Sequence, residues 1–208
     1  MALGPEIAAK DPEARRRRIL DATVKVLRAR GFAGTRVADI AAEAGTSPGL
    51  VLYHYKSLEG ALAAALTAVE DSFYSELERD LAASQGPVER IRHMGELGAG
   101  SGPAVGDWAL WLELWVRALR HEGARTTREA LDRRWRAVLR ATIRSGVASG
   151  EFAAESIEDT TIRLASLMDG LAIQLALDDP DMTPDRMCDL WLASASLELA
   201  THIHRGPR

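Results

Sequence analysis

Apolar residues recur along most of the chain at the spacing of an α-helix, and no segment alternates convincingly between apolar and polar positions as a half-buried strand does. The clearest pattern lies in residues 35–55, where two short helices are predicted on either side of a tight turn. The inner face of the first helix carries four apolar residues at helical spacing: Val37, Ile40, Ala41 and Ala44. This layout predicts a helix-turn-helix, a shape that can present its second helix to the major groove of DNA.

The predicted boundaries of these two helices rest on residues that favour helix ends. The hydroxyl of Thr35 can accept a free backbone N–H at the start of the first helix, and Gly45 suits the left-handed conformation that ends it. Ser47 is the predicted cap of the second helix, and Pro48 takes its first position, where the missing N–H costs nothing. Such a shape also occurs without DNA, so an ordinary helical hairpin is the alternative interpretation of this segment alone.

The rest of the chain also predicts helices, so the expected fold class is all-α with about nine to ten helices. We expect residues 1–57 to form a small three-helix domain, with residues 1–13 as a flexible arm, and residues 58–208 to form a C-terminal helical domain. The further predicted helices cover about 14–30, 58–84, 88–97, 105–121, 124–149, 156–178 and 184–204.

Composition narrows the class of protein. The chain has 208 residues, of which 47% are hydrophobic and 27% charged, as in a soluble protein of one or two domains. Cys188 is the single cysteine, which excludes an internal disulfide framework and a cysteine-rich metal site. No two of the five histidines are placed to share a metal ion, and we expect no cofactor. The sequence shows neither a signal peptide nor an apolar run of the ~20 residues needed to cross a bilayer, so we expect a cytoplasmic protein that does not bind membranes.

Charge is distributed unevenly along the chain. Residues 1–60 carry ten Lys or Arg and seven Asp or Glu, a net charge of +3, whereas the whole chain carries −4. The remainder therefore carries −7. Four consecutive arginines, Arg15–Arg18, stand at the point where the arm meets the first helix and could touch the DNA backbone. A solvated surface is the alternative interpretation of this basic segment.

The N-terminal part of the sequence resembles the TetR family of transcriptional regulators. The resemblance rests on the residues 19–22, 31–35, 40–51 and 53–55, followed by Ser57, Glu59 and Leu62. A weaker resemblance, over residues 108–152 and 167–171, is to the effector domain of the BetI-like branch of that family. It implies an N-terminal DNA-binding domain and a C-terminal domain for ligand binding and dimerisation.

The resemblance also implies which residues meet DNA. Members of the family dimerise and place the second helix of the motif in the major groove. The implied base-edge contacts are Val37, Ala38, Ser47, Pro48, Gly49 and Leu50, and the implied phosphate-side contacts are Thr35, Arg36, Tyr53, His54 and Lys56. The chain departs from the family pattern at Leu52 and Leu58, where a tyrosine and a lysine usually grip phosphates. Tyr53 and Lys56 could compensate.

The resemblance further implies a small-molecule pocket among the C-terminal helices. The candidate ligand-binding residues are Trp108, Trp111, Trp115, Trp135, Met168, Glu113 and Asp169. For each tryptophan the alternative is ordinary core packing. Glu113 and Asp169 lie in apolar stretches and would be costly to bury unpaired, so a cationic or hydroxylated ligand is one interpretation and a helix cap, salt bridge or surface role is the other.

The last two predicted helices carry the candidate dimer interface. Its residues are Leu164, Leu167, Leu171, Leu175, Leu190, Trp191, Ser194 and Leu197. Two such helices from each chain would form a four-helix bundle, and packing within one chain is the alternative.

These observations predict a transcriptional regulator that is not an enzyme. The expected partners are a palindromic double-stranded DNA operator, a small-molecule effector and a second copy of the chain, and the expected mode is a homodimeric repressor that the effector releases from DNA. Two other classes remain as alternatives: an all-α enzyme, and a helical interaction module whose motif does not function.

Overall fold

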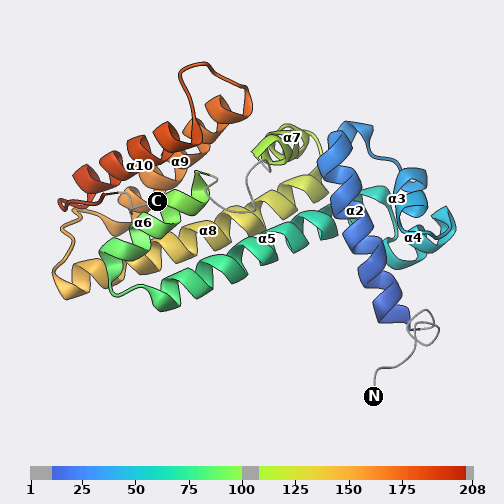
Figure 1. Cartoon of the computed structure of the whole chain (residues 1–208), viewed down its shortest axis with the longest axis horizontal. Helices are drawn as coiled ribbons and strands as arrows, with labels where there is room; N and C mark the ends of the chain where they lie inside the picture. Colours follow the sequence, from blue (N-terminus) through green and yellow to red (C-terminus); the bar gives the residue numbers. More distant parts are fainter. Residues whose placement is uncertain (1–10, 100–107, 205–208) are drawn as a thin grey trace. The chain divides into compact units, whose positions relative to one another are not determined.

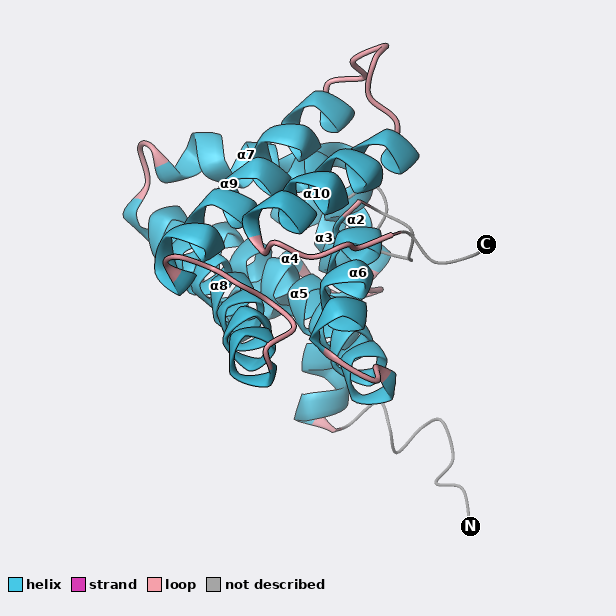
Figure 2. Cartoon of the chain, turned by 90° about the vertical axis from the view of Figure 1, so that its left-hand side faces the viewer, coloured by secondary structure: helices cyan, strands magenta, loops and turns pink. Residues whose placement is uncertain are grey.

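The fold is all-α, as predicted, in the part of the chain that the computed structural model describes, residues 11–99 and 108–204 (Figure 1). These residues form nine helices and no strand (Figure 2). The helices are α2 (Pro12–Gly34), α3 (Val37–Glu43), α4 (Pro48–Tyr55), α5 (Leu58–Ala83), α6 (Pro87–Gly98), α7 (Trp108–Ala118), α8 (Glu122–Ser149), α9 (Ile157–Ala176) and α10 (Pro184–Glu198). The predicted helices are confirmed in number and order, with ends that shift by a few residues.

Two predictions about helix ends are wrong. Helix α2 begins at Pro12, capped by the Asp11 side chain, so Arg15–Arg18 lie inside its first turns rather than at the junction with an arm. Most of the predicted arm, residues 1–10, lies outside the described residues. Helix α3 has Arg36 rather than Thr35 at its N-cap, because the Thr35 hydroxyl turns back and donates to the carbonyl of Gly31 at 2.6 Å.

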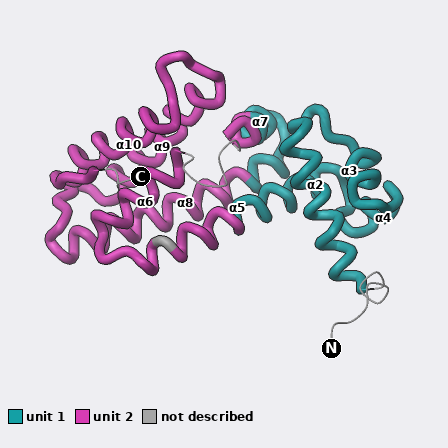
Figure 3. Tube along the Cα trace, in the orientation of Figure 1, with its two compact units in different colours: residues 1–71, 113–127 teal, residues 72–112, 128–208 magenta. Residues whose placement is uncertain are grey.

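The chain divides into two compact units (Figure 3). Unit 1 contains residues 1–71 and 113–127, and unit 2 contains residues 72–112 and 128–208. Unit 1 extends beyond residue 57, where we expected the first domain to end, because Ala61 at the start of α5 packs into the core of the helix-turn-helix. Helices α5, α7 and α8 each contribute residues to both units.

The helix-turn-helix is held on α2 by a small buried core and by polar contacts around it. Four of its core side chains are Ile19, Ile40, Val51 and Tyr55. The Tyr55 hydroxyl donates to the carbonyl of Arg16 at 2.9 Å, which ties α4 to α2, and burial raises the pKa of this phenol. Two ion pairs join α2 to α3: Arg30 with Asp39 at 2.7 Å and Lys25 with Glu43 at 2.5 Å.

The core of unit 2 forms around α6, α9 and α10. Trp191 of α10 is fully buried, and its Nε1 donates to the carbonyl of Leu164 in α9 at 2.9 Å. Gly95 allows α6 to approach α10 closely, since a Cβ at this position would lie 2.9 Å from Trp191. Helices α9 and α10 lie side by side in both views (Figures 1 and 2). Over the described residues, none of the helices combines the length and apolar character needed to cross a membrane.

Candidate DNA interface and effector residues

The beginning of α4 presents a set of small side chains and one aromatic side chain to solvent. Ser47, Pro48, Gly49 and Tyr53 are exposed, and 69% of the Tyr53 surface is accessible. The Ser47 hydroxyl accepts the backbone N–H of Leu50 at 3.3 Å, which confirms the predicted cap of this helix. A helix that begins with small residues lets the DNA backbone and base edges approach its N-terminus closely.

Helix α3 contributes less to this surface than the sequence predicted. Ala38 is exposed, whereas Val37 is half-buried and packs against the core of the helix-turn-helix, as does Leu50 of α4. Val37 and Leu50 therefore pack mainly against the core, and only part of each side chain is accessible to a DNA molecule.

The residues implied to contact phosphate fall into two groups. Arg36 and Lys56 are exposed, and the Lys56 ammonium donates to the carbonyl of Tyr53 at 3.1 Å, at the C-terminal end of α4. Thr35 is buried, so its predicted contact with a DNA phosphate is wrong. Its hydroxyl donates to the carbonyl of Gly31 and does not face solvent. His54 is half-buried, and its Nε2 is enclosed without a hydrogen-bond partner.

The two leucines that depart from the family pattern occupy different environments. Leu58 is half-buried and packs against the core of the helix-turn-helix. Leu52 is 40% exposed on α4, next to Tyr53. At position 52, where the family usually has a phosphate-binding tyrosine, this chain therefore exposes an apolar side chain beside the exposed Tyr53.

Glu113 of α7 caps the end of α2. Its Oε2 accepts the backbone N–H of Phe32 at 2.6 Å and that of Ala33 at 3.4 Å. These N–H groups become available because the chain breaks from helical geometry at Gly31, where φ is 65° and ψ is −179°. Of the two roles considered for this carboxylate, the structure supports the helix cap rather than a direct ligand contact.

Asp169 of α9 is the second carboxylate singled out from the sequence. Burial, followed by the nearby charge of Asp132, raises its pKa to about 6, although Arg136 and Arg128 oppose this shift. Asp132 on α8 has a raised pKa as well, mainly because it is buried, and pairs with Arg128 at 3.3 Å. Two half-buried carboxylates with raised pKa values thus lie near one another on α8 and α9, with Arg128 and Arg136 as the nearby positive charges.

The candidate tryptophans are held mainly by contacts within the protein. Trp108 donates from its Nε1 to the carbonyl of Gly98 at 3.1 Å. Trp135 packs against Phe73 with ring centroids 6.2 Å apart, and its Nε1 is buried without a partner. Trp111 and Trp115 are half-buried, and Met168 is buried in the core of unit 2.

The predicted dimer residues do not share one environment. Leu164 and Trp191 are buried within their own subunit, so the structure corrects this part of the prediction: neither has surface to offer a partner. Three more, Leu167, Leu171 and Leu175, are half-buried and pack against the core of unit 2. Leu190 and Leu197 are exposed, the latter by 84%, and Ser194 between them is half-buried.

Two exposed apolar residues of this region were missed by the sequence prediction. Ile162 and Leu177, at the start of α9 and just beyond its end, are 49% and 66% exposed. The helical period of α9 could have shown that Ile162 lies on the opposite side from the buried Leu164, since residues two apart in a helix face different directions.

A short, exposed helix on a three-helix core, joined to a larger helical unit, defines the chain as a helix-turn-helix DNA-binding protein. Family models agree with this class. Residues 19–65 match the model described as bacterial regulatory proteins of the tetR family, and residues 87–199 match the model described as the C-terminal part of the BetI-type transcriptional repressor. The chain belongs to the TetR family of transcriptional regulators, with a BetI-type C-terminal region.

Individual relatives support the same assignment. The HTH-type transcriptional regulator BetI of Paraburkholderia phymatum is 28% identical over 178 residues, which cover 81% of this chain and 85% of the relative. A putative transcriptional regulator from Saccharomonospora viridis, solved in complex with choline, is 28% identical with a TM-score of 0.77 and covers 85% of this chain and 92% of its own. A putative TetR-family regulator from Rhodococcus sp. shares the fold, with 24% identity, a TM-score of 0.78 and coverage of 89% and 98%.

Proposed function

We propose that the chain acts as a homodimeric repressor whose α4 helices read a palindromic operator. The observation that carries this proposal is the exposed surface of Ser47, Pro48, Gly49 and Tyr53 at the beginning of α4. Few of these groups can form paired hydrogen bonds with a base, so specificity relies on apolar contact with thymine methyl groups and on DNA shape. Phosphate contacts come from Tyr53, Lys56 and Arg36.

DNA binding is tested with Tyr53. Footprinting upstream of the gene's own start codon first locates the operator. Y53A should then weaken operator binding by about 100-fold, since two copies each lose a hydrogen bond and a ring contact of roughly 1–1.5 kcal/mol. Fluorescence anisotropy measures the affinity, and circular dichroism should show an unchanged helix content because Tyr53 is exposed.

The control for this experiment is Y53F, which keeps the ring and removes the hydroxyl. An intermediate loss in Y53F would assign part of the contact to the hydroxyl. Operator affinity should also fall steeply with salt because phosphate contacts release counterions. An affinity that is insensitive both to salt and to Y53A would contradict the proposed DNA surface.

We propose a small organic cation as the effector, bound beside Asp132 and Asp169. The half-buried carboxylates of Asp132 and Asp169 support this assignment, since a bound cation would add to the charge compensation that Arg128 and Arg136 already give them. The choline bound by the Saccharomonospora viridis relative is a molecule of this class. Differential binding of the cation to one conformer would then shift the regulator away from the form that fits DNA.

Effector binding should depend on pH. Below a pH of about 6 the Asp169 carboxyl is largely protonated and neutral, so a cation gains little from it. As pH rises from 5 to 7 the carboxylate forms, and choline affinity should increase by up to about tenfold per unit below the pKa before levelling off. Isothermal titration calorimetry at several pH values measures this profile. The variant D169N should bind choline weakly and lose the pH dependence, and a profile unchanged by D169N would remove Asp169 from the site.

A further inference from the structure

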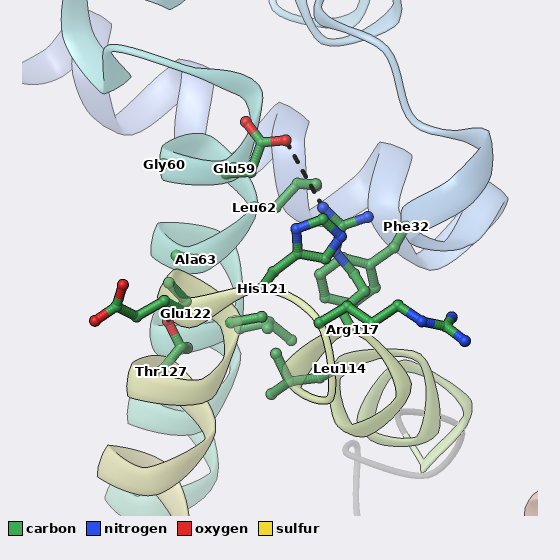
Figure 4. Close-up of a pocket in the computed structure, with 14 residues that line it drawn as sticks. Phe32, Glu59, Gly60, Leu62, Ala63, Leu114, Arg117, His121, Glu122 and Thr127 are labelled. Atoms are coloured by element: carbon green, nitrogen blue, oxygen red, sulfur yellow. Dashed lines mark hydrogen bonds and ion pairs between the residues drawn. The ribbon is translucent and has the colours of Figure 1, made fainter.

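Unit 1 contains a cavity that neither the DNA surface nor the Asp132–Asp169 pair uses. It has a volume of about 470 Å³, within the ~300–1,000 Å³ of small-molecule sites. The end of α2, the first turns of α5, the end of α7 and the start of α8 contribute its walls (Figure 4). All of the residues that line it belong to unit 1.

The interior of this cavity is apolar. Its lining includes five apolar side chains from three helices: Phe32, Leu62, Ala63, Leu66 and Leu114. Four of them are buried, with 1–6% of their surface exposed, and Ala63 is half-buried. An apolar chain placed here would cover the apolar surface that the lining still exposes, which favours binding in proportion to the area covered.

The rim of the cavity is polar and carries arginines. Arg117 pairs with Glu59 at 3.7 Å, and its guanidinium lies 5.7 Å from the centre of the Phe32 ring. Arg120 and His121 are exposed on the same rim. Among the lining residues only Glu59 and Glu122 are acidic. Glu59 already pairs with Arg117. Figure 4 shows the Glu122 carboxylate directed away from Phe32 and Arg117.

We propose that this cavity binds an amphipathic anion: a carboxylate of fatty-acid type with an unbranched apolar chain. The chain would lie against Phe32, Leu62 and Leu114, and the carboxylate would meet Arg120 at the rim, where an arginine forms paired hydrogen bonds with carboxylate oxygens. This ligand differs in charge and in place from the cation proposed for Asp132 and Asp169.

The cavity is connected to the helix-turn-helix through Phe32. The ring of Phe32 lines the cavity, while its backbone N–H is held by Glu113, and only three residues separate it from Arg36, the N-cap of α3. A ligand that displaces the ring would therefore disturb the turn from which α3 begins. This part of the inference rests on the proposed function, and it gives the anion a way to lower operator affinity.

Binding itself is tested by calorimetry on the full chain with three probes that share one tail: decanoate and decyltrimethylammonium below their micellar concentrations, and 1-decanol below its solubility limit. We expect decanoate to bind most tightly. The variant R120Q should weaken decanoate roughly fivefold, the value of a partly exposed ion pair, and leave 1-decanol unchanged. The variant A63F should abolish binding of decanoate and 1-decanol by filling the cavity, and D169N should leave both unchanged. Decyltrimethylammonium is compared in D169N, because the unaltered chain also offers a cation the proposed site beside Asp169.

Several results would overturn the proposal: no binding of decanoate, equal or tighter binding of decyltrimethylammonium in the D169N background, or decanoate affinity unchanged in both R120Q and A63F. R120Q alters an exposed side chain and so remains informative if A63F fails to fold. Operator binding is measured separately. Saturating decanoate should weaken it in the unaltered chain and not in A63F, and an unaffected operator affinity would overturn the coupling. If the chain binds no DNA at all, the calorimetric results still decide the site.

Discussion

Replacing Leu197 with arginine is expected to separate the proposed homodimer into monomers. Leu197 is 84% exposed in the single subunit, so the substitution removes no contact within it, whereas a two-fold interface through α9 and α10 would bury two copies of the side chain. Loss of roughly 2–3 kcal/mol per leucine, before any cost of burying the new charges, raises the dimer dissociation constant by about a thousandfold or more. Sedimentation equilibrium measures this constant.

The chain supplies a matched control in Leu119, which lies just beyond the end of α7 and is 76% exposed. The variant L119R introduces the same charge at a similarly exposed leucine and should leave dimerisation and operator affinity unchanged. L197R should also lose most of its operator affinity, because a single α4 reads only one half-site and the second lies ~34–36 Å away along the DNA. A dimer of unchanged stability in L197R would place the interface elsewhere.

Replacing Gly31 with alanine is expected to destabilise the protein by about 3 kcal/mol. The backbone at this residue has φ 65° and ψ −179°, a conformation that is essentially restricted to glycine and costs other residues roughly 1–3 kcal/mol. The added Cβ would also collide with Oε1 of Glu113, which would disturb the cap on the N–H groups of Phe32 and Ala33. Urea unfolding measures the free-energy difference.

Gly45 provides a control that separates the cost of the backbone conformation from the cost of the collision with Glu113. It too has a positive φ, 59°, but a Cβ there would meet no atom within 4 Å. The variant G45A should therefore cost only about 1 kcal/mol, the backbone penalty of a left-handed alanine. An equal loss of stability in G31A and G45A would show that the close approach of Glu113 to Gly31 has no energetic weight.

The sequence predicted those parts of the site that depend on local chemistry. Ser47 and Pro48 define the start of α4 because a hydroxyl cap and a proline act within one turn of the helix, and the structure has both where they were expected. Thr35 failed as a cap because its hydroxyl can either accept a backbone N–H of the following helix or donate to a carbonyl of the preceding one. In the structure the hydroxyl donates to the carbonyl of Gly31, four residues earlier.

Side-chain roles that depend on distant contacts could not be predicted. The stripe of leucines in α9 predicted an apolar face, but not that Leu164 would be covered by Trp191 of the same subunit while Ile162 stays exposed. Glu113 was recognised as an unusual carboxylate in an apolar stretch. Its partner, the N–H of Phe32, lies 81 residues earlier in the chain, a separation that no local pattern can bridge.

The amino-acid sequence alone determined an all-α chain with a capped helix-turn-helix near its N-terminus, because helical period and caps are local properties. Tertiary structure alone decided which apolar faces are covered within the subunit, how Glu113 holds the end of α2, and that burial, followed by the nearby charge of Asp132, raises the pKa of Asp169 to about 6. The covered faces, the Glu113 contacts and the raised pKa all depend on which helices lie side by side, because burial and charge act through space at short range.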